Sequence, residues 1–256
     1  MCLSSRSARG GWSYASNPMT TIYSALRDAI RAGRAVATAT LLAGPGAAGA
    51  KLLLWPDGSA EGSLGDPALD ARVRADAAPL LARGEGRLLE YAELGATVFV
   101  ESFVPPPSLF MVGGVHIAVA LATMAQVVGF RTVVVDARSA FASEERFAHV
   151  DELVLAWPDE ALEGRLDARS CVAVLTHDPK LDDPALRVAL RSPARYIGAL
   201  GSPSTHAKRL ERLRAEGFSE QELARIHGPI GLTIGAKTPE QIALSILAQI
   251  VQVQRA

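Results

Sequence analysis

The sequence predicts an α/β protein with a small mixed α/β domain at residues 19–104 and a parallel-sheet domain at residues 105–256. Three observations lead to this prediction. A chain of 256 residues, 49% of them hydrophobic, is long enough to build two cores. After residue 108, short apolar runs alternate with helical patterns, which is typical of a parallel sheet covered on both faces. Between the two halves stands Pro105-Pro106-Pro107, a stiff run that cannot donate backbone hydrogen bonds and therefore suits a spacer.

The first domain opens with a helix, because Ile22, Leu26 and Ile30 recur at helical spacing before Gly33. Two apolar runs joined by a flexible link then form a hairpin-like unit. An amphipathic helix with Pro67 in its first turn follows, and two more strands complete the domain. The expected segments are strands at 35–42, 51–55, 87–91 and 97–103 and a helix at 66–83.

In the second domain, the expected strands and helices alternate more strictly than in the first. Residues 202–203 supply a cap and a first-turn proline for one late helix, and residues 238–241 resemble a capping box before the apolar stripe of the last helix. The expected strands lie at 109–112, 132–135, 152–156, 171–175 and 196–200, and the expected earlier helices at 115–128 and 184–191.

Composition excludes several classes of function. The net charge is -1 and the charges are spread evenly along the chain, so neither nucleic acid nor a membrane surface is an expected partner. No apolar stretch has the length of a signal peptide or a membrane span, which predicts a soluble cytoplasmic protein. Only Cys2 and Cys171 occur, too few and too far apart for a disulfide framework or a zinc site, so no metal ligands are expected.

Two glycines mark the first candidate site. Gly113 and Gly114 stand between an expected strand and helix, and Asp136 follows about 20 residues later at the end of the next strand, the context of a Rossmann dinucleotide fingerprint. Val115 occupies the place of the glycine that lets a diphosphate approach the backbone, which weakens the case for a dinucleotide. A phosphate on the helix N-terminus and a plain tight turn are the two remaining interpretations. The domain is expected to be Rossmann-like in either case.

Two polar side chains in the same region each have two interpretations, one as a ligand contact and one as an ordinary structural or solvent-facing residue. His116 could donate to a phosphate or a pterin carbonyl, or simply face solvent at the start of its helix. Asp136 could bind a ribose hydroxyl, or be an ordinary acid where a parallel strand meets solvent.

Thr176-His177-Asp178 follows another strand and should reach the same rim of the sheet, where ligands of open α/β sheets bind. His177 can move a proton near neutral pH and Asp178 can stabilise its cation, so these two are the catalytic candidates, with Thr176 as a cofactor contact. The alternative is that the trio only caps the following helix.

Gly198, Gly201 and Ser202 bracket the next strand end and would present a second set of helix amides to an anion. An ordinary helix start explains them equally well. The chain contains no G-x-S-x-G elbow, Walker loop or H-E-x-x-H pair, so hydrolase, nucleoside triphosphatase and zinc-protease functions are not indicated.

Taken in order, these motifs resemble the xanthine dehydrogenase accessory factor family of XdhC/CoxI type. The similarity is specific in the second domain and weaker in the first. The segments that carry it are 113–118, 134–136, 175–178, 196–202, 205–210, 226–232 and 235–243, with 49–53 and 62–64 in the first domain.

This resemblance implies a protein that binds the molybdenum cofactor, protects it while a cysteine desulfurase supplies the terminal sulfur, and passes it to a xanthine dehydrogenase or CO dehydrogenase type molybdenum hydroxylase. Members of the family often carry a cysteine where this chain has Ala68, so thiolate ligation of molybdenum is not expected there. Cys171 does not replace it, because it opens an expected buried strand.

Two other functions stay open at the level of sequence. An NAD(P)-dependent oxidoreductase would use His177 as proton donor and Asp136 for the ribose, and a non-catalytic scaffold would only present a surface for hydroxylase maturation. A homodimer through the apolar helix at 242–253 is also possible, although the same stripe could cover the sheet.

Overall fold

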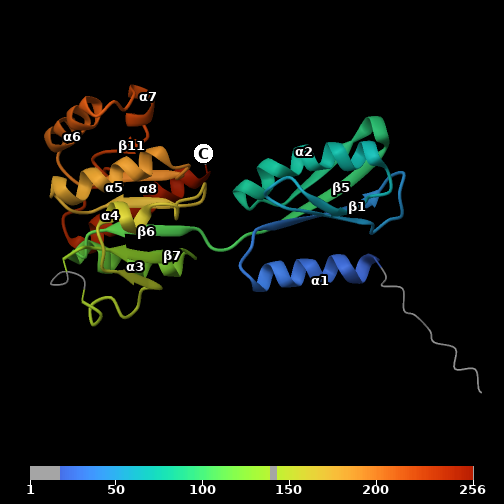
Figure 1. The fold of residues 1–256 in the computed structure, drawn as a ribbon, viewed down its shortest axis with the longest axis horizontal. Coiled ribbons are helices and arrows are strands. Elements are labelled where there is room, and N and C mark those ends of the chain that lie inside the picture. Colours follow the sequence, from blue (N-terminus) through green and yellow to red (C-terminus); the bar gives the residue numbers. More distant parts are fainter. Residues whose placement is uncertain (1–17, 139–142, 256) are drawn as a thin grey trace, which may run out of the picture. The chain divides into compact units, whose positions relative to one another are not determined.

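The computed structural model describes residues 18–138 and 143–255, so Cys2 lies outside the described part of the chain. Backbone contacts divide the protein into two compact units, Met1–Pro105 and Pro106–Ala256, which are described separately. Figure 1 shows the helices and strands of each unit.

The N-terminal unit is built on a five-stranded antiparallel sheet in the order β3-β2-β1-β5-β4. Two helices cover its opposite faces (Figure 1). The elements are α1 (Pro18–Arg31), β1 (Val36–Ala43), β2 (Lys51–Leu54), β3 (Ala60–Gly62), α2 (Pro67–Arg83), β4 (Arg87–Tyr91), the 3-10 turn η1 (Ala92–Leu94) and β5 (Ala96–Phe103).

Local chemistry explains helix α2. The carboxylate of Asp66 accepts hydrogen bonds from the amides of Ala68 and Leu69, and Pro67 occupies the first turn, where its missing N–H has no intrahelical partner to lose. Leu69 and Leu80 are buried against the sheet, which fixes the apolar face of this helix.

The C-terminal unit contains a six-stranded sheet in the order β11-β10-β9-β6-β7-β8, in which every neighbouring pair is parallel. Its inner strands are almost entirely buried on both faces, as is typical of a parallel sheet. They are β6 (Ser108–Val112), β7 (Arg131–Val135), β8 (Glu152–Val154), β9 (Cys171–Val174), β10 (Tyr196–Ala199) and β11 (Ile226–His227).

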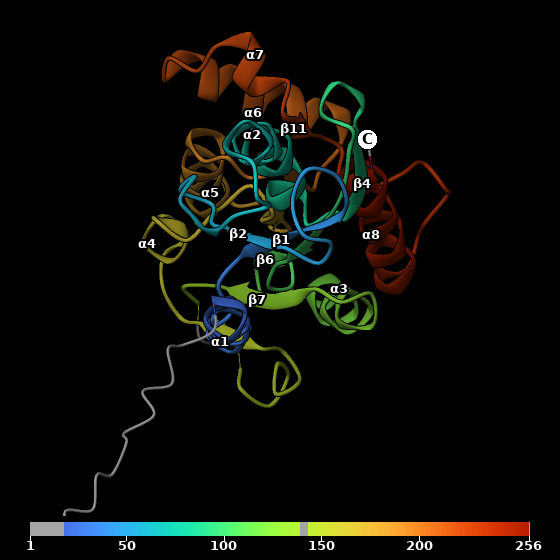
Figure 2. The same ribbon diagram turned by 90° about the vertical axis from the view of Figure 1, so that its right-hand side faces the viewer.

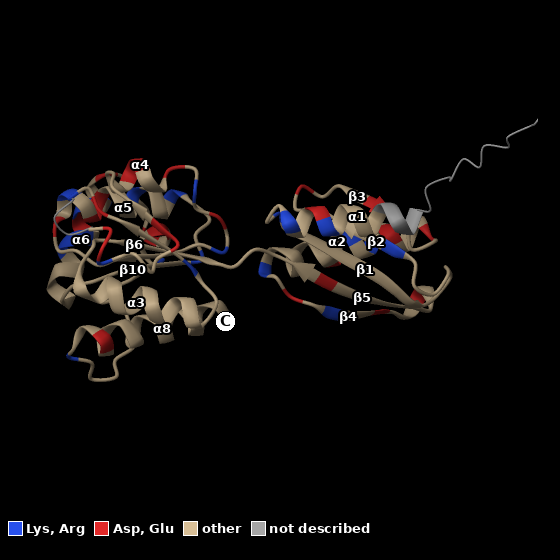
Figure 3. Ribbon diagram, turned by 90° about the horizontal axis from the view of Figure 1, so that it is seen from below, with Lys and Arg blue, Asp and Glu red and all other residues tan. Residues whose placement is uncertain are grey.

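Two groups of helices cover this sheet. The first group packs in one core and the second group in the core on the other face. Figures 2 and 3 show α3 and α8 side by side on their face of the sheet. The first group is α4 (Pro158–Leu162), α5 (Pro179–Arg191), α6 (Pro203–Ala215) and α7 (Glu220–Leu223); the second is α3 (His116–Val127) and α8 (Pro239–Arg255).

The fold class expected from the sequence is confirmed: a mixed α/β chain with a parallel Rossmann-like sheet in its second half. One helix is longer than expected. Helix α5 begins at Pro179, not at Pro184, because Asp178 caps it and Pro179 fills its first turn. In the described residues, no helix combines the length and the apolar character needed to cross a bilayer.

Five short elements have no counterpart in the sequence-based expectation. They are too brief to show a helical or alternating pattern. These elements are β3, η1, α4, α7 and β11.

Candidate functional site

The candidate site lies at the carboxyl edge of the parallel sheet. Strand β6 is central, and the chain order reverses between β6 and its neighbour β9, which is the place where ligands of open α/β sheets bind. We call the loops that follow β6, β7, β9 and β10 the rim. They contain residues 113–115, 136–138, 176–178 and 200–202.

Gly113 brings two loops of the rim into contact. Its φ of +112° is a conformation that side chains rarely adopt, and its amide donates to the Val135 carbonyl at 2.8 Å. A Cβ at this position would lie 2.4 Å from the methyl carbon of Thr176. The glycine is therefore required by the close approach of the loop after β9.

Asp136 is buried and fully engaged by the protein itself. One carboxylate oxygen accepts from the Gly114 amide and the Arg138 guanidinium, each at 2.8 Å. The other accepts from the Arg138 amide and Nε, each at 2.9 Å. Burial alone would raise the pKa of Asp136, but these hydrogen bonds and the Arg138 charge hold it below its ordinary value.

A carboxylate offers about four lone-pair sites, and all of them are used here. Asp136 thus organises the rim, and a ribose hydroxyl would have to displace one of these donors.

A buried chain of polar contacts joins the loop after β9 to the loop after β10. The Thr176 hydroxyl donates to Asp182, whose other oxygen accepts from Arg209 at 3.1 Å. Arg209 also donates to the Leu200 carbonyl at 2.9 Å. Thr176 therefore acts through this network, and its hydroxyl is not left for a ligand.

Arg209 is only 1% exposed, and its Nε and Nη1 have no hydrogen-bond partner among the described residues. Nδ1 of His206, one turn earlier on α6, is also buried and has no hydrogen-bond partner among the described residues. Buried polar atoms without partners are rare in proteins and indicate an ordered water or a bound polar group nearby.

The two catalytic candidates differ in their surroundings. Asp178 is the N-cap of α5, where its carboxylate accepts from the Lys180 amide at 3.0 Å, so the capping role foreseen as the alternative is present. His177 is exposed, and within the described ranges its side chain makes no hydrogen bond or ion pair. The imidazole is therefore available to a ligand or a partner.

Of the three candidates around β10, two reach the rim. Gly201 has a φ of +144° and Ser202 caps α6 by accepting from the Thr205 amide at 3.1 Å. Gly198 lies inside β10, where a Cβ would meet the Ile230 side chain and the Tyr196 hydroxyl at 2.6 Å. Gly198 is thus needed for packing and does not belong to the rim.

Three helices begin at the rim, and their first turns differ. Helices α5 and α6 carry side-chain caps, whereas the N-cap residue of α3, Val115, provides none. Apart from the Ala118 amide, which donates to the Val115 carbonyl at 3.0 Å, the first-turn amides of α3 are accordingly the ones that an anion can approach.

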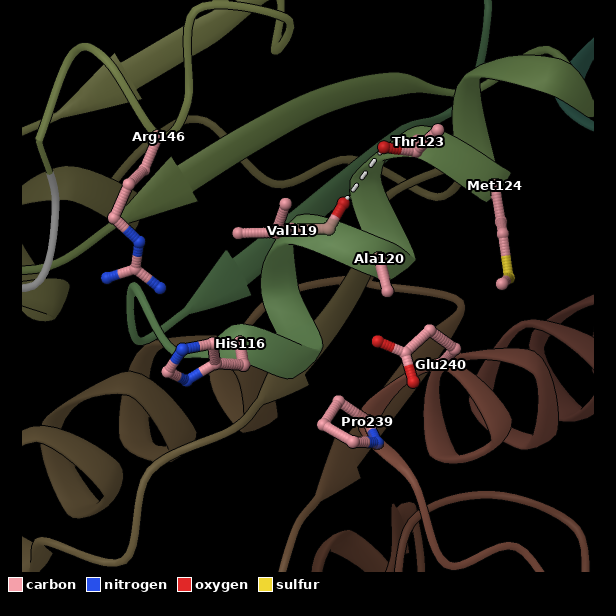
Figure 4. Close-up of a pocket in the computed structure, with 8 residues that line it drawn as sticks. All are labelled: His116, Val119, Ala120, Thr123, Met124, Arg146, Pro239 and Glu240. Atoms are coloured by element: carbon pink, nitrogen blue, oxygen red, sulfur yellow. Dashed lines mark hydrogen bonds between the residues drawn. The ribbon is translucent and has the colours of Figure 1, made fainter.

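A groove of about 570 Å³ lies beside the start of α3 and runs between α3 and α8. We call it the α3–α8 groove. Figure 4 shows His116 at one end, Glu240 reaching from α8 toward Ala120, and Arg146 from the segment after β7. His116, a sequence candidate, thus lines this groove next to the rim. The lining residues are His116, Val119, Ala120, Thr123, Met124, Arg146, Pro239 and Glu240.

The described residues contain no group of three His, Cys, Asp or Glu side chains placed to hold a metal ion. Cys171 is buried in β9, and burial raises the pKa of its thiol to about 12. Its sulfur is therefore protonated at neutral pH and remote from the rim in the strand register.

Sequence reasoning missed Arg138, Arg146, Asp182, Arg209 and Glu240. Asp182 and Arg209 could have been noticed, because each places a charge on the apolar stripe of its helix. The groove could not, since it requires knowledge that α3 and α8 pack together.

Comparison with known proteins gives relatives for most of the chain. An uncharacterized protein of Escherichia coli, YqeB, is 31% identical over 218 residues, which is 80% of this chain and 40% of that protein. A Bacillus subtilis protein described as a probable xanthine dehydrogenase subunit is 30% identical over 168 residues, 65% of this chain and 49% of that protein. The molybdenum cofactor insertion chaperone PaoD of Escherichia coli is 36% identical over 90 residues, 35% of this chain and 28% of that protein.

The chain spans less than half the length of each of these curated relatives. A crystal structure from Bacillus halodurans, described as a xanthine dehydrogenase, has a similar fold with a TM-score of 0.53 at 21% identity, covering 91% of this chain and 96% of that one. Residues 109–250 match the XdhC Rossmann domain and residues 29–92 match the XdhC and CoxI family. Because the first match alone covers more than half of the chain, the resemblance seen in the sequence is confirmed, and this protein belongs to the XdhC and CoxI family.

Proposed function

We propose that this chain binds the molybdenum cofactor and serves as an accessory protein for a molybdenum hydroxylase of xanthine dehydrogenase or CO dehydrogenase type. The observation that carries the proposal is the uncapped N-terminus of α3 beside the Gly113-Gly114 turn, in a family with a relative named as a cofactor insertion chaperone. The phosphate of the cofactor would bind to these amides, because helix N-termini attract anions.

The described residues fit the organic part of the cofactor better than its metal. Open helix amides and the exposed imidazoles of His116 and His177 are suitable partners for a phosphate and for polar ring atoms. The unpartnered N–H groups of Arg209 lie next to the same loops and favour a polar occupant or ordered water there. No thiolate is available from Cys171. The chain would therefore hold the cofactor by its phosphate and ring and leave the metal coordination to the cofactor's own ligands.

The proposed role in the cell includes two partners. A cysteine desulfurase would supply the terminal sulfur while the cofactor stays bound, and the hydroxylase would then receive it. Support comes from the names of the relatives, one an insertion chaperone and one a probable dehydrogenase subunit. His177 is the titratable rim side chain that makes no hydrogen bond or ion pair in the described residues, so it is the group we assign to the bound cofactor or the partner.

The test is to mix the purified chain with molybdenum cofactor released from a hydroxylase and to follow binding by pterin fluorescence. We expect saturable binding with one site per chain. A chain that retains no cofactor when the cofactor is shown to be intact would overturn the proposal.

An NAD(P)-dependent oxidoreductase is the competing function, and the geometry of Asp136 argues against it. Both carboxylate oxygens are already occupied by Arg138 and the Gly114 amide, so the ribose contact of a dinucleotide site is missing. Titration with NAD and NADP is expected to give no micromolar binding. Micromolar affinity together with turnover of a carbonyl compound would favour the oxidoreductase instead.

A further inference from the structure

The α3–α8 groove has an apolar floor. Val119, Ala120 and Met124 are half-buried on the side of α3 that faces the groove. The Thr123 hydroxyl is turned back to the Val119 carbonyl at 3.0 Å, so this residue adds little polarity (Figure 4). Such a floor suits the face of a flat ring.

Among the described residues, Glu240, from α8, is the one acidic residue that lines the groove. Helix α3 contains no Lys, Arg, Asp or Glu, and α8 contains only Glu240 and its last residue, Arg255. Figure 3 shows the two helices almost free of charged residues. Hydrogen bonds from its own amide and from Thr238 lower the pKa of Glu240, so its carboxylate is ionised at neutral pH.

Two basic side chains, His116 and Arg146, lie together at one end of the groove (Figure 4). His116 interacts electrostatically with Glu240, and the guanidinium of Arg146 also lines the cavity. Arg146 lies over the Phe147 ring, 5.6 Å from its centroid, which helps to hold the side chain in place. His116 is the first residue of α3, so this basic end adjoins the helix amides that lack a cap.

The groove therefore combines an apolar floor, one carboxylate and a basic end. A carboxylate binds best to two adjacent N–H groups, because its two oxygens accept both at once. The 2-amino-4-oxopyrimidine ring of a pterin or a guanine presents this pair of donors, whereas adenine and cytosine present one donor beside an acceptor.

We propose that the α3–α8 groove binds the 2-amino-4-oxopyrimidine ring of a pterin or guanine compound, with Glu240 accepting its two N–H groups and its anionic substituent facing His116 and Arg146. The proposal rests on the proposed function in one respect, since it gives the ring of the cofactor a place beside the phosphate site. His177 does not line the groove, so it is left for another part of the cofactor or for a partner.

The experiment uses the full chain and small probes. Pterin-6-carboxylate is fluorescent and carries the ring with an anionic substituent, guanosine monophosphate carries the same donor pair, and adenosine monophosphate lacks it. We expect the first or the second to bind and adenosine monophosphate to bind at least tenfold more weakly. The tighter of the two binders identifies the source of the ring. Adenosine monophosphate binding as tightly as both, or no binding of either ring compound, would overturn the proposal.

Glu240→Gln is the decisive variant, because it keeps the size of the side chain and replaces one acceptor with a donor. Binding of the preferred ring compound should weaken at least tenfold. Glu160→Gln is the matched control, since Glu160 is also an exposed acid in a proline-started first turn, that of α4, and lies outside the groove. Ala120→Phe, which fills the groove, should abolish ring binding as well.

The outcomes separate this proposal from the proposed function. Cofactor binding that is equally tight in the wild type and in Glu240→Gln would overturn the proposal that the groove binds the ring, and it would leave the proposed accessory function intact. Ring binding that is lost in Glu240→Gln, with no binding of the intact cofactor by the wild type, would support the groove and overturn the accessory function.

Discussion

Arg138 closes a two-point ion pair on Asp136, with Nε and Nη2 of the guanidinium 2.9 and 2.8 Å from the two carboxylate oxygens. The pair lies only two residues apart at the end of β7, and the second oxygen of Asp136 also holds the Gly114 amide. The acid that a dinucleotide site would offer to a ribose is thus used to fix the turn before α3.

Arg138→Ala tests how much this pair contributes. The buried carboxylate would lose both hydrogen bonds from the guanidinium and keep those from the Gly114 and residue 138 amides. Because about a third of the Arg138 side chain is exposed, we expect a loss of about 1–3 kcal/mol in the free energy of unfolding, below the value for a fully buried pair. Urea unfolding at pH 7 measures it, with Arg214→Ala, from the exposed pair with Glu220, as control.

The same variant has a predictable pH dependence. The pKa of Asp136 is lowered in the folded protein, so its contribution is present above the unfolded value, about 3.9, and disappears as the pH falls through the folded value. Without Arg138 that pKa rises toward the unfolded value, so Asp136 contributes less to the loss of stability on acidification, and the difference in stability between Arg138→Ala and the wild type should shrink as the pH falls below about 3.9. Unchanged acid unfolding in Arg138→Ala would contradict this.

Gly113→Ala tests the close contact with Thr176. The added Cβ would lie 2.4 Å from the Thr176 methyl, and the backbone would keep a φ of +112°. We therefore expect the free energy of unfolding to fall by about 2–4 kcal/mol. Gly129→Ala, at a φ of +89° with open space around it, should cost only about 1–2 kcal/mol. Thr176→Ser in the Gly113→Ala background removes the methyl and keeps the hydroxyl, and should recover part of the difference in thermal unfolding.

The sequence predicted the sheet well and the polar network poorly, for a physical reason. Strands such as Cys171–Val174 are short, continuous apolar runs, and this composition alone indicates that both of their faces are buried. The ion pair of Asp182 and Arg209 depends on two helices meeting across the rim, which no local pattern contains. Pro184 resembles a helix start in sequence, although Asp178-Pro179 is the stronger start signal.

The candidate site divides in the same way. The rim loops, with Gly113, Asp136, His177 and Gly201, follow from strand order, because the carboxyl ends of parallel strands share one edge. What each side chain does there depends on contacts of higher order. The four hydrogen bonds on Asp136 show this, since a fingerprint acid and a turn-fixing acid look identical in sequence.

Arg209→Met should be among the most damaging substitutions in the C-terminal unit. It leaves the carboxylate of Asp182 buried without its cation, and we expect a loss of about 3–5 kcal/mol in the free energy of unfolding. Asp182→Asn in the same background removes the stranded charge and keeps an acceptor for Thr176, so the double variant should be more stable than Arg209→Met alone. Equal or lower stability of the double variant, measured by urea unfolding, would contradict the pairing.

Two histidines should make the protein less stable in mild acid. Burial lowers the pKa of His227, and burial together with Arg209 lowers that of His206. The unfolded chain then binds more protons than the folded one, so stability falls as the pH drops below about 6.5 toward the folded values, by at most about 1.4 kcal/mol per pH unit for each group.

His227→Phe isolates one of them. His227 stacks on Tyr196 with ring centroids 4.9 Å apart, and phenylalanine preserves the stacking without a titrating group. We expect a smaller fall in stability between pH 7.5 and 5.5 than in the wild type. Chemical unfolding at several pH values measures the slope, and an identical slope in both proteins would contradict the assignment to His227.

His177→Gln tests the titratable rim side chain that makes no hydrogen bond or ion pair among the described residues. Because the imidazole is exposed, we expect the free energy of unfolding to stay within about 0.5 kcal/mol of the wild type, so any functional loss reports on the ligand or partner. Asp178→Asn is the companion variant, since asparagine caps a helix as well as aspartate and removes only the charge. Activation of a molybdenum hydroxylase in cells, with the variants supplied in place of the wild type, should fall at least tenfold for His177→Gln if the imidazole acts on the bound cofactor. Full activation by both variants would show that the rim carries no proton-transfer role and would favour a scaffold that acts through another surface.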